Sequence, residues 1–264
     1  MLPIFFGYLG SLAMGFVLGL IGGGGSIMAI PILVYLFGIE PTLAITYSLF
    51  IVGFTSLFAS VNHIRYQNFC LDTALLFGSS SVVSVVLMRW LVVPLLPKVL
   101  FCVNGFCVTK SMFLLVLFAG LMFLSAYKML TNTALNPKED LKPHLFFLMA
   151  SGFGVGCITG LIGAGGGFLI VPSLVVFAQL DIKKAIGTSL LIIGVNTLIG
   201  FGISVFGTGL ALDWRLLLGF LSVSVVGSFL GTRLVKYISD KKLKPIFAYF
   251  LLIMASYILI KELF

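Results

Sequence analysis

The 264-residue chain has few charged residues, which make up only 9% of it, whereas hydrophobic residues make up 60%. An average soluble domain is roughly 45–50% apolar. This shortage of charge excludes a soluble globule, which would lack the polar side chains to cover its surface. Residues 5–39, 41–61 and 187–212 carry no charge, and each stretch can cross about 30 Å of hydrocarbon as a helix. The sequence predicts an all-α polytopic membrane protein.

Carboxylates, histidines and paired cysteines are also scarce. None of the eight Asp and Glu falls in the middle of an expected span, so no buried carboxylate proton relay is indicated. A CxxC motif is absent, and we expect no metal and no cofactor. Only Cys102 and Cys107 lie close in sequence, around Asn104-Gly105, a dipeptide typical of hairpin turns that brings two thiols together. A disulfide is expected there only if the loop faces an oxidising compartment.

The net charge of +8 does not indicate a nucleic-acid partner, because Lys and Arg occupy short loops and helix ends. Such charges set orientation in a membrane. An intramembrane serine protease needs a Ser nucleophile near a His base. Ser26 with His63 is the one pairing to consider, and no Gly-x-Ser-Gly setting is present. We therefore expect no enzyme, and the apolar N-terminus, without a basic region or cleavage site, is expected to be a retained first span.

Two glycine-rich stretches interrupt apolar segments: residues 19–26, followed by Pro31, and residues 160–167, followed by Pro172. Consecutive glycines leave the backbone uncovered, so inside a membrane they need protein or a water-filled cavity around them. The first segment is expected to be a helix to about Ile21, a break, and a short helix over residues 26–37.

The second half of the chain repeats the first. A shift of 141 residues aligns residues 15–85 with 156–226, and 25 of these 71 positions are identical, against a chance level of about one in ten. The sequence predicts repeats at 1–130 and 144–264, joined by a polar linker at 131–143. Each repeat has four segments, giving about 8 spans, or about 10 if each broken segment is a hairpin.

Paired interrupted segments at equivalent positions of two repeats are typical of secondary transporters, which bind substrate where the repeats meet. The repeats are parallel if each broken segment crosses once, and inverted if it enters and returns. Counting Lys and Arg hardly separates these alternatives. The inverted arrangement is preferred because it is the commoner one for such sites.

The Gly-x-x-Gly-x-Gly-Gly…Pro pattern in both halves, followed by Ala44–Leu49 and Ala185–Leu190, resembles the TauE/SafE sulfite-exporter-like permeases. The resemblance spans nearly the whole chain. It implies a bacterial or archaeal inner-membrane permease for small anions, often sulfur-containing ones such as sulfite, thiosulfate or sulfonates. Thr46-Tyr47 replaces the Gly187-Thr188 of the second half, which puts symmetric use of the two Thr-Ser positions in doubt.

A helix that begins after a glycine break presents free N–H groups and a partial positive charge. Two such starts would cradle an oxyanion without a buried cation. The candidate binding residues are Gly22, Gly24, Gly25, Ser26, Ser48, Gly163, Gly165, Gly166, Gly167, Thr188, Ser189 and Asn196. The alternatives are that the glycines only pack helices and that the hydroxyls bond to their own helices. Packing is preferred for the isolated Gly53, Gly78, Gly194 and Gly219.

His63 and Arg65 are placed in a short interfacial loop, where they either recruit and gate anions or are simply solvated. Arg89 and Arg233 are expected to extend to the headgroups, and Asp72 and Asp213 to cap helices. A passive anion channel of the same architecture is the alternative function. The sequence leaves open the anion, the direction of transport, the coupling ion, proton or sodium, and the oligomeric state.

Overall fold

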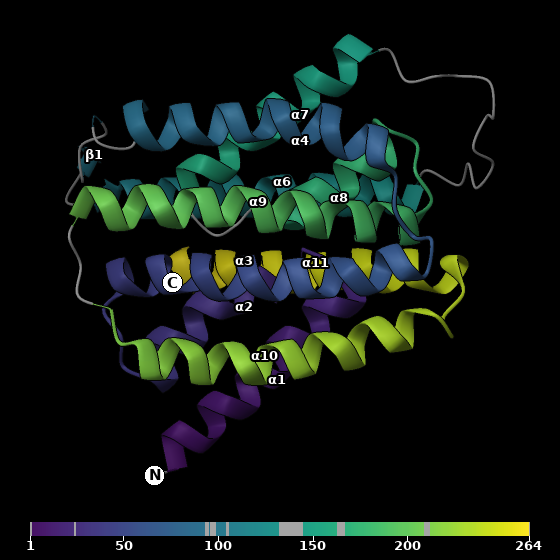
Figure 1. The fold of residues 1–264 in the computed structure, drawn as a ribbon. Helices are drawn as coiled ribbons and strands as arrows, with labels where there is room; N and C mark the ends of the chain where they lie inside the picture. The colour runs from purple at the N-terminus through teal and green to yellow at the C-terminus, as the bar shows by residue number, and fades with distance from the viewer. Residues whose placement is uncertain are drawn as a thin grey trace.

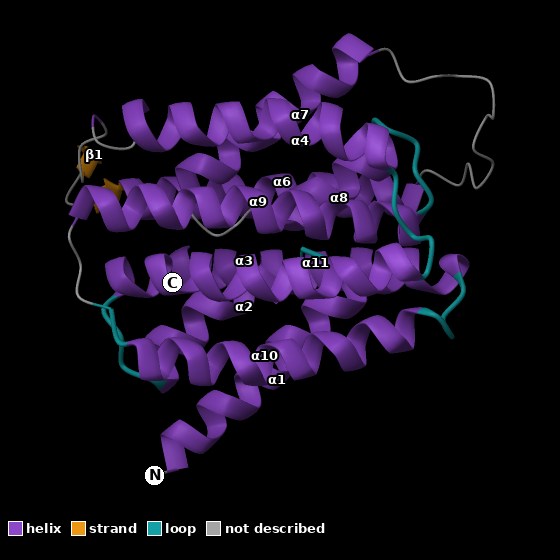
Figure 2. Cartoon of the chain, in the orientation of Figure 1, coloured by secondary structure: helices purple, strands orange, loops and turns teal. Residues whose placement is uncertain are grey.

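A computed structural model describes residues 2–23, 25–92, 95, 99–103, 106–131, 145–162, 167–208 and 212–263. Almost all of this part of the chain is helical (Figures 1 and 2). The helices of the first half are α1 (Leu2–Ile21), α2 (Gly25–Pro31), α3 (Pro41–Arg65), α4 (Leu71–Leu87) and α6 (Lys110–Thr131). Those of the second half are α7 (Leu145–Ile162), α8 (Gly167–Val176), α9 (Ile182–Thr208), α10 (Trp214–Val235) and α11 (Asp240–Leu263). Two π-helical segments, η1 (Ile32–Leu36) and η2 (Met88–Val92), directly follow α2 and α4.

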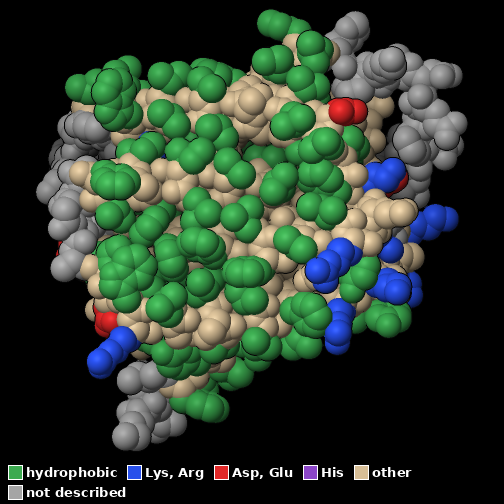
Figure 3. All heavy atoms as spheres, in the orientation of Figure 1, with side chains coloured by type: hydrophobic (Ala, Val, Ile, Leu, Met, Phe, Trp, Pro, Cys, Tyr) green, Lys and Arg blue, Asp and Glu red, His purple; other side chains and the backbone are tan. Residues whose placement is uncertain are grey.

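The helices have the length and composition of membrane spans. Five helical segments of the described chain qualify: Leu43–Arg65, Leu71–Val92, Ile182–Phe206, Trp214–Val235 and Lys241–Ile260. Hydrophobic side chains cover the middle of the visible face (Figure 3). Exposed Trp90 and Trp214 lie just after α4 and at the start of α10, and exposed Tyr66 and Tyr237 lie just after α3 and α10. These two sets of helix ends are at opposite ends of the bundle (Figure 1), as are the aromatic belts of membrane proteins. The protein is a multi-pass helical membrane protein, as predicted.

The two halves pack by exchanging helices. α1 lies along α10, and α7, the counterpart of α1, lies along α4, the counterpart of α10. The equivalent helices α3 and α9 pack against each other, as do α6 and α11. Each first helix of a repeat therefore lies against the third long helix of the other repeat.

Glycines allow these exchanged helices to approach closely. A Cβ atom on Gly15 or Gly19 of α1 would overlap the carbonyls of Ser224 and Ser228 on α10. In the same way, a Cβ on Gly156 of α7 would overlap the Ser84 hydroxyl of α4 and lie within 2.5 Å of a backbone carbonyl there. Small residues spaced by four let helices pack through dispersion contacts in lipid, where no hydrophobic force drives them together.

The isolated glycines give a mixed result. A Cβ on Gly53 would lie 2.7 Å from Leu198, and one on Gly194 would lie 2.5 Å from Leu57, so both hold α3 and α9 together as expected. A Cβ on Gly219 would lie 2.8 Å from the Tyr8 hydroxyl, another tight contact. Gly78 leaves ordinary space, 3.4 Å from Ile192.

The segment between η2 and α6 contains an antiparallel hairpin of β1 (Val99–Val103) and β2 (Phe106–Thr109). Cys102 is directly opposite Cys107 in its register, as the turn dipeptide predicts. The side chains of these cysteines, and Asn104-Gly105, lie outside the described residues, so the disulfide stays a prediction. The expected loop is thus partly a two-stranded hairpin.

The two ends of the bundle differ in charge. The ends of α3 and α10 and the starts of α9 and α11 lie at one end (Figure 1), and Lys and Arg gather there (Figure 3). We call this end the cation-rich face; its residues are Arg65, Lys183, Lys184, Arg233, Lys236, Lys241, Lys242 and Lys244. The opposite end, which holds β1 and β2, is called the hairpin face.

Candidate functional site

The first glycine stretch ends α1 and begins α2. The Gly22 N–H donates the last bond of α1 to the Leu18 carbonyl, 2.8 Å away. Gly22 then adopts a φ of +80°, a left-handed conformation that glycine reaches without steric cost and that commonly ends helices. Helix resumes at Gly25.

After this break the chain turns back along α1. A Cβ on Gly25 would lie 2.5 Å from the Met14 carbonyl, and one on Gly10 would lie 3.3 Å from Ile32. Further on, the Phe37 ring packs edge-on against Tyr8, with 5.5 Å between ring centroids. Residue 37 therefore lies beside residue 8, and the chain after the break runs back alongside α1.

The second glycine stretch meets the first. α7 ends at Ile162 and α8 begins at Gly167. A Cβ on Gly167 would lie 2.5 Å from the Gly23 Cα, and one on Gly22 would lie 3.0 Å from Val171 of α8. The two breaks, which lie 141 residues apart in the sequence, therefore touch in space. Of the candidate glycines, Gly24, Gly163, Gly165 and Gly166 lie outside the described residues.

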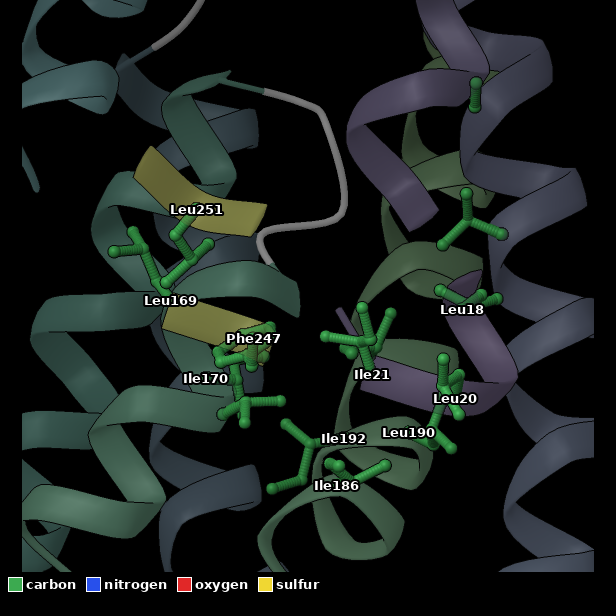
Figure 4. Close-up of a cluster of buried hydrophobic side chains, with 14 of the residues drawn as sticks. Leu18, Leu20, Ile21, Leu169, Ile170, Ile186, Leu190, Ile192, Phe247 and Leu251 are labelled. Atoms are coloured by element: carbon green, nitrogen blue, oxygen red, sulfur yellow. The ribbon is translucent and has the colours of Figure 1, made fainter. Parts of the chain in front are cut away.

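The surroundings of the breaks are apolar. Ile21 lies near Ile186 and Ile192 of α9, while Leu169 and Ile170 of α8 lie beside Phe247 and Leu251 of α11 (Figure 4). All of these side chains are buried. An ion held at the breaks would be shielded from lipid, and the field of nearby backbone dipoles is stronger in such a low-dielectric setting.

Most of the predicted hydroxyl donors form hydrogen bonds to backbone carbonyls three residues earlier in the chain. The Oγ atoms of Ser26, Ser48 and Ser189 donate to the carbonyls of Gly23, Ile45 and Ile186, at 2.7, 2.7 and 2.8 Å. Thr188 Oγ1 accepts a bond from the backbone N–H of Cys70, at 3.0 Å. Ser189 is nonetheless next to the first break, since a Cβ on Gly22 would lie 3.1 Å from its Oγ.

Asn196 and its counterpart Thr55 are buried at positions facing the opposite half. Asn196 Nδ2 donates to Ser81 Oγ at 2.7 Å, across from α9 to α4. Its Oδ1 and the Thr55 Oγ1 are buried and have no hydrogen-bond partner within the described part of the chain. Unsatisfied buried polar atoms are uncommon and are often explained by an unobserved water or ion.

The placement of His63 in a solvated loop is wrong. α3 continues to Arg65, and the His63 side chain is fully buried. Its Nε2 lies 3.3 Å from the Gly19 carbonyl just before the first break, so Nε2 is the donor and Nδ1 has no partner among the described residues. Gly187 lets α9 approach the end of α3 closely, since a Cβ there would overlap the Asn68 carbonyl and lie 2.9 Å from the His63 Cβ.

Arg65 is exposed at the end of α3. The serine protease alternative gains no support, since Ser26 and His63 are each bonded to a backbone carbonyl instead of to one another. The structure thus separates the two residues that were considered together for gating: one is buried beside the break, and the other lies on the cation-rich face.

The expected position of Arg89 at the headgroups is also wrong. Its guanidinium turns inward, and Nη1 donates to the Gly200 carbonyl at 3.1 Å and to Ser204 Oγ at 2.8 Å. Arg233 is exposed, as expected, and lies 4.3 Å from the Phe229 ring. No sequence pattern indicates the inward direction of Arg89, because an Arg near a helix end has the same pattern whether it points outward or inward.

The two aspartates differ. Asp213 caps α10, since its Oδ1 accepts from the backbone N–H groups of Arg215 and Leu216, at 3.0 and 3.2 Å. Asp72 lies in the first turn of α4 without a capping bond, and Cys70 occupies the cap position. Sequence reasoning missed Tyr47, whose hydroxyl accepts from the Asp213 N–H at 2.7 Å and ties α3 to the start of α10.

Comparison with known proteins identifies the family. The family model described as sulfite exporter TauE/SafE matches residues 8–258. The chain belongs to the TauE/SafE family. Similar proteins include a probable membrane transporter protein of Xylella fastidiosa, 28% identical over 93% of this chain and 91% of the relative. YunE of Bacillus subtilis, also a probable membrane transporter protein, is 26% identical over 96% of both chains.

A further relative, from Methanocaldococcus jannaschii, is 25% identical over 94% of this chain and 93% of its own, and is likewise described as a probable membrane transporter protein. No solved structure matches the chain. The family and these relatives indicate a membrane transporter, in agreement with the expectation from the sequence.

Proposed function

We propose that this TauE/SafE protein is a secondary permease of the inner or cell membrane that carries small anions, with sulfite, thiosulfate and organosulfonates as the substrate class. The two glycine breaks bind the anion where they meet. The observation that carries the proposal is the contact of Gly22 and Gly23 with Gly167 and Val171, inside a bundle of membrane helices.

Backbone amides supply the attraction in this proposal. Each break is followed by a helix start, where the first N–H groups have no acceptor within the helix and a partial positive charge of about half an electron is present. At the start of α2, the Ser26 N–H donates to the Gly23 carbonyl at 3.3 Å. The glycines Gly22, Gly24, Gly25, Gly163, Gly165, Gly166 and Gly167 let an oxyanion approach these amides. Ser189 Oγ lies next to Gly22, and Thr188 and Asn196 are on the same helix, α9. The hydroxyls of Ser26, Ser48 and Ser189 each donate to a backbone carbonyl three residues earlier.

The two repeats have inverted topology in this proposal. The return of Phe37 to Tyr8 supports an entering and returning segment in the first half, and the exchanged packing of α1 with α10 and of α7 with α4 supports a two-fold relation between halves. Rocking one repeat against the other would then expose the breaks to each side in turn.

Transport of labelled sulfite into proteoliposomes tests the proposal. A permease gives saturable uptake that is accelerated by unlabelled sulfite inside, whereas a passive channel, the alternative function, gives uptake without that acceleration at near-diffusive rates. Binding of only cations or neutral solutes by the purified protein would contradict the anion site.

The variant Gly167→Ala tests the location of the site. Its Cβ would force the start of α8 away from Gly23, so we expect at least a tenfold loss of sulfite uptake. Gly154→Ala, also in the second broken segment, is the matched control because its Cβ meets nothing within 4 Å. Equal uptake by both variants would place the site elsewhere.

A further inference from the structure

The helix α1 ends inside the bundle, so its last carbonyls need donors from elsewhere. The final four carbonyl groups of an α-helix have no N–H donor within the helix. At the end of α1 the Leu18 carbonyl accepts from the Gly22 N–H at 2.8 Å. The next carbonyl, that of Gly19, is approached by His63 Nε2 of α3 at 3.3 Å and by Thr232 Oγ1 of α10 at 3.5 Å. The Gly19 carbonyl therefore joins α1 to two other helices directly before the first break.

His63 is the stronger of these two donors. Thr232 has one hydroxyl proton, and its shorter bond, 2.8 Å, goes to the Ser228 carbonyl of its own helix. Because a carbonyl only accepts, the His63 proton lies on Nε2, and Nδ1 has no partner among the described residues. A buried carbonyl without a donor is costly. His63 thus supplies a bond that α1 does not make within itself.

The backbone around His63 fixes the position of its ring. The His63 carbonyl accepts from the N–H groups of Tyr66 and Asn68, at 3.2 and 2.9 Å, which closes the turn after α3. On the other side, a Cβ on Gly187 of α9 would lie 2.9 Å from the His63 Cβ. The ring is fully buried between these contacts. It therefore holds the end of α1 at a set position relative to α3 and α9.

The end of α1 determines where the first break lies. Gly19 precedes Gly22 by three residues, which is about 4.5 Å of helix rise. Gly22 turns the chain with a φ of +80°, and a Cβ on it would lie 3.0 Å from Val171 of α8. On the side of α10, a Cβ on Gly19 would overlap the Ser228 carbonyl. A displacement of the Gly19 carbonyl would therefore move the first break relative to the second.

The second half has a different residue at the position of His63. The 141-residue shift pairs His63 with Ser204. Ser204 Oγ donates to the Gly200 carbonyl of its own helix at 2.9 Å and accepts from Arg89 Nη1 at 2.8 Å. A ring that reaches from α3 to α1 in the first half thus corresponds to a hydroxyl that donates within α9.

We propose that His63 is a positioning residue of the anion site: its Nε2–H bond to the Gly19 carbonyl holds the first glycine break against the second in the arrangement that binds the anion. The inference rests on the proposed function, because it assumes that the anion binds where the breaks meet. In this role His63 acts through the backbone of α1 and does not touch the anion.

The sulfite affinity of His63 variants tests this role, with full-length protein in lipid nanodiscs. His63→Gln keeps an N–H donor near the position of Nε2, His63→Asn places its donor near the position of Nδ1, and His63→Leu has none. The dissociation constant for ³⁵S-labelled sulfite should stay within about threefold for His63→Gln and rise at least about tenfold for the other two. Equal weakening in all three variants, or unchanged affinity in His63→Leu, would overturn the inference.

Thr232→Val is the matched control for the second contact with the Gly19 carbonyl. Because the Thr232 proton goes to Ser228, this variant should stay within about threefold of the unmodified protein in sulfite affinity. A tenfold loss in Thr232→Val with none in His63→Leu would assign the role to Thr232 instead of His63.

Amide hydrogen exchange over residues 19–25, measured without any anion, separates this inference from the proposed function. Exchange there should be at least about tenfold faster in His63→Leu and His63→Asn than in the unmodified protein and His63→Gln. Exchange in α6, which packs chiefly against α11, should be equal in all four proteins. Unchanged exchange over residues 19–25 in His63→Leu would overturn the inference. A lack of sulfite, thiosulfate and sulfonate binding by the unmodified protein would overturn the proposed function, while the exchange rates still show whether His63 holds the break.

If His63→Asn and His63→Leu fail to fold, a protein that keeps His63 decides. The one other histidine of the chain, His144, is replaced by Gln, and solid-state NMR is recorded with ¹⁵N-labelled histidine and ¹³C-labelled glycine carbonyls. We expect a protonated Nε2 in dipolar contact with a glycine carbonyl. An unprotonated Nε2, or the lack of this contact, would overturn the inference.

Discussion

Gly22 and Gly38 are the glycines with positive φ among the described residues, at +80° and +69°. They differ in surroundings. A Cβ on Gly22 would lie 3.0 Å from Val171 and 3.1 Å from Ser189 Oγ, whereas one on Gly38 meets nothing within 4 Å. The first glycine is needed for both conformation and contact between halves, and the second for conformation alone.

Replacement of each glycine by alanine separates these two needs. Both changes place a Cβ in a left-handed conformation, which costs about 1–2 kcal/mol, and both should lower the melting temperature of the purified protein. Only Gly22→Ala should also weaken sulfite binding, because its Cβ presses on α8 and α9. Equal loss of binding in Gly38→Ala would show that the effect is a general loss of stability.

The residues that sequence reasoning placed wrongly share one physical cause. His63 lies in a polar run, residues 62–68, which predicts a loop, yet the helix extends to Arg65 and Gly187 of α9 packs closely against the His63 Cβ. Arg89 points inward because Gly200 and Ser204 provide acceptors on a helix distant in sequence. In both cases a helix of the other repeat, α9, packs against the residue, and a single sequence does not reveal this contact.

At the scale of elements, the starts and breaks of helices were predictable, and their facing sides were not. Glycines and Pro mark the ends of helices directly. Facing sides are hidden because the same apolar residues meet protein and lipid: Phe220 is fully buried, while Phe229 on the same helix is 39% exposed. Only the glycine rows, such as Gly15 and Gly19, mark a contact side.

The duplicated helices α4 and α10 offer a matched test of helix capping. Asp213→Ala removes a side chain that accepts two backbone N–H bonds, so it should reduce the free energy of unfolding by about 1 kcal/mol. Asp72→Ala removes only a charge near the helix start and should cost about 0.3 kcal/mol. Detergent-titrated unfolding of both variants would measure the difference, and equal costs would contradict the capping assignment.

At the scale of the molecule, the unequal charge of the two ends predicts its orientation. Positive loops remain on the cytoplasmic side of membranes, so the cation-rich face should be cytoplasmic and the hairpin face external. The hairpin with Cys102 and Cys107 would then lie in the compartment where disulfides form.

Labelling of single cysteines in intact cells checks this orientation. In a variant without the four native cysteines, Phe206→Cys at the hairpin face should react with a membrane-impermeant maleimide. Tyr237→Cys at the cation-rich face should react only after permeabilisation. These side chains are 92% and 82% exposed and lie at or just beyond the ends of spans, so burial in the protein does not block the reaction. The reverse labelling pattern would show that the cation-rich face is external and the hairpin face cytoplasmic.

The exchanged helices also dictate an order of events during biosynthesis. α1 leaves the ribosome well before α10, the helix against which it packs most extensively. Until α10 is inserted, Gly15 and Gly19 of α1 contact lipid or a chaperone in place of α10. The N-terminal repeat is therefore not an autonomous folding unit, and a chain truncated before α10 would leave its first helix without a docking partner.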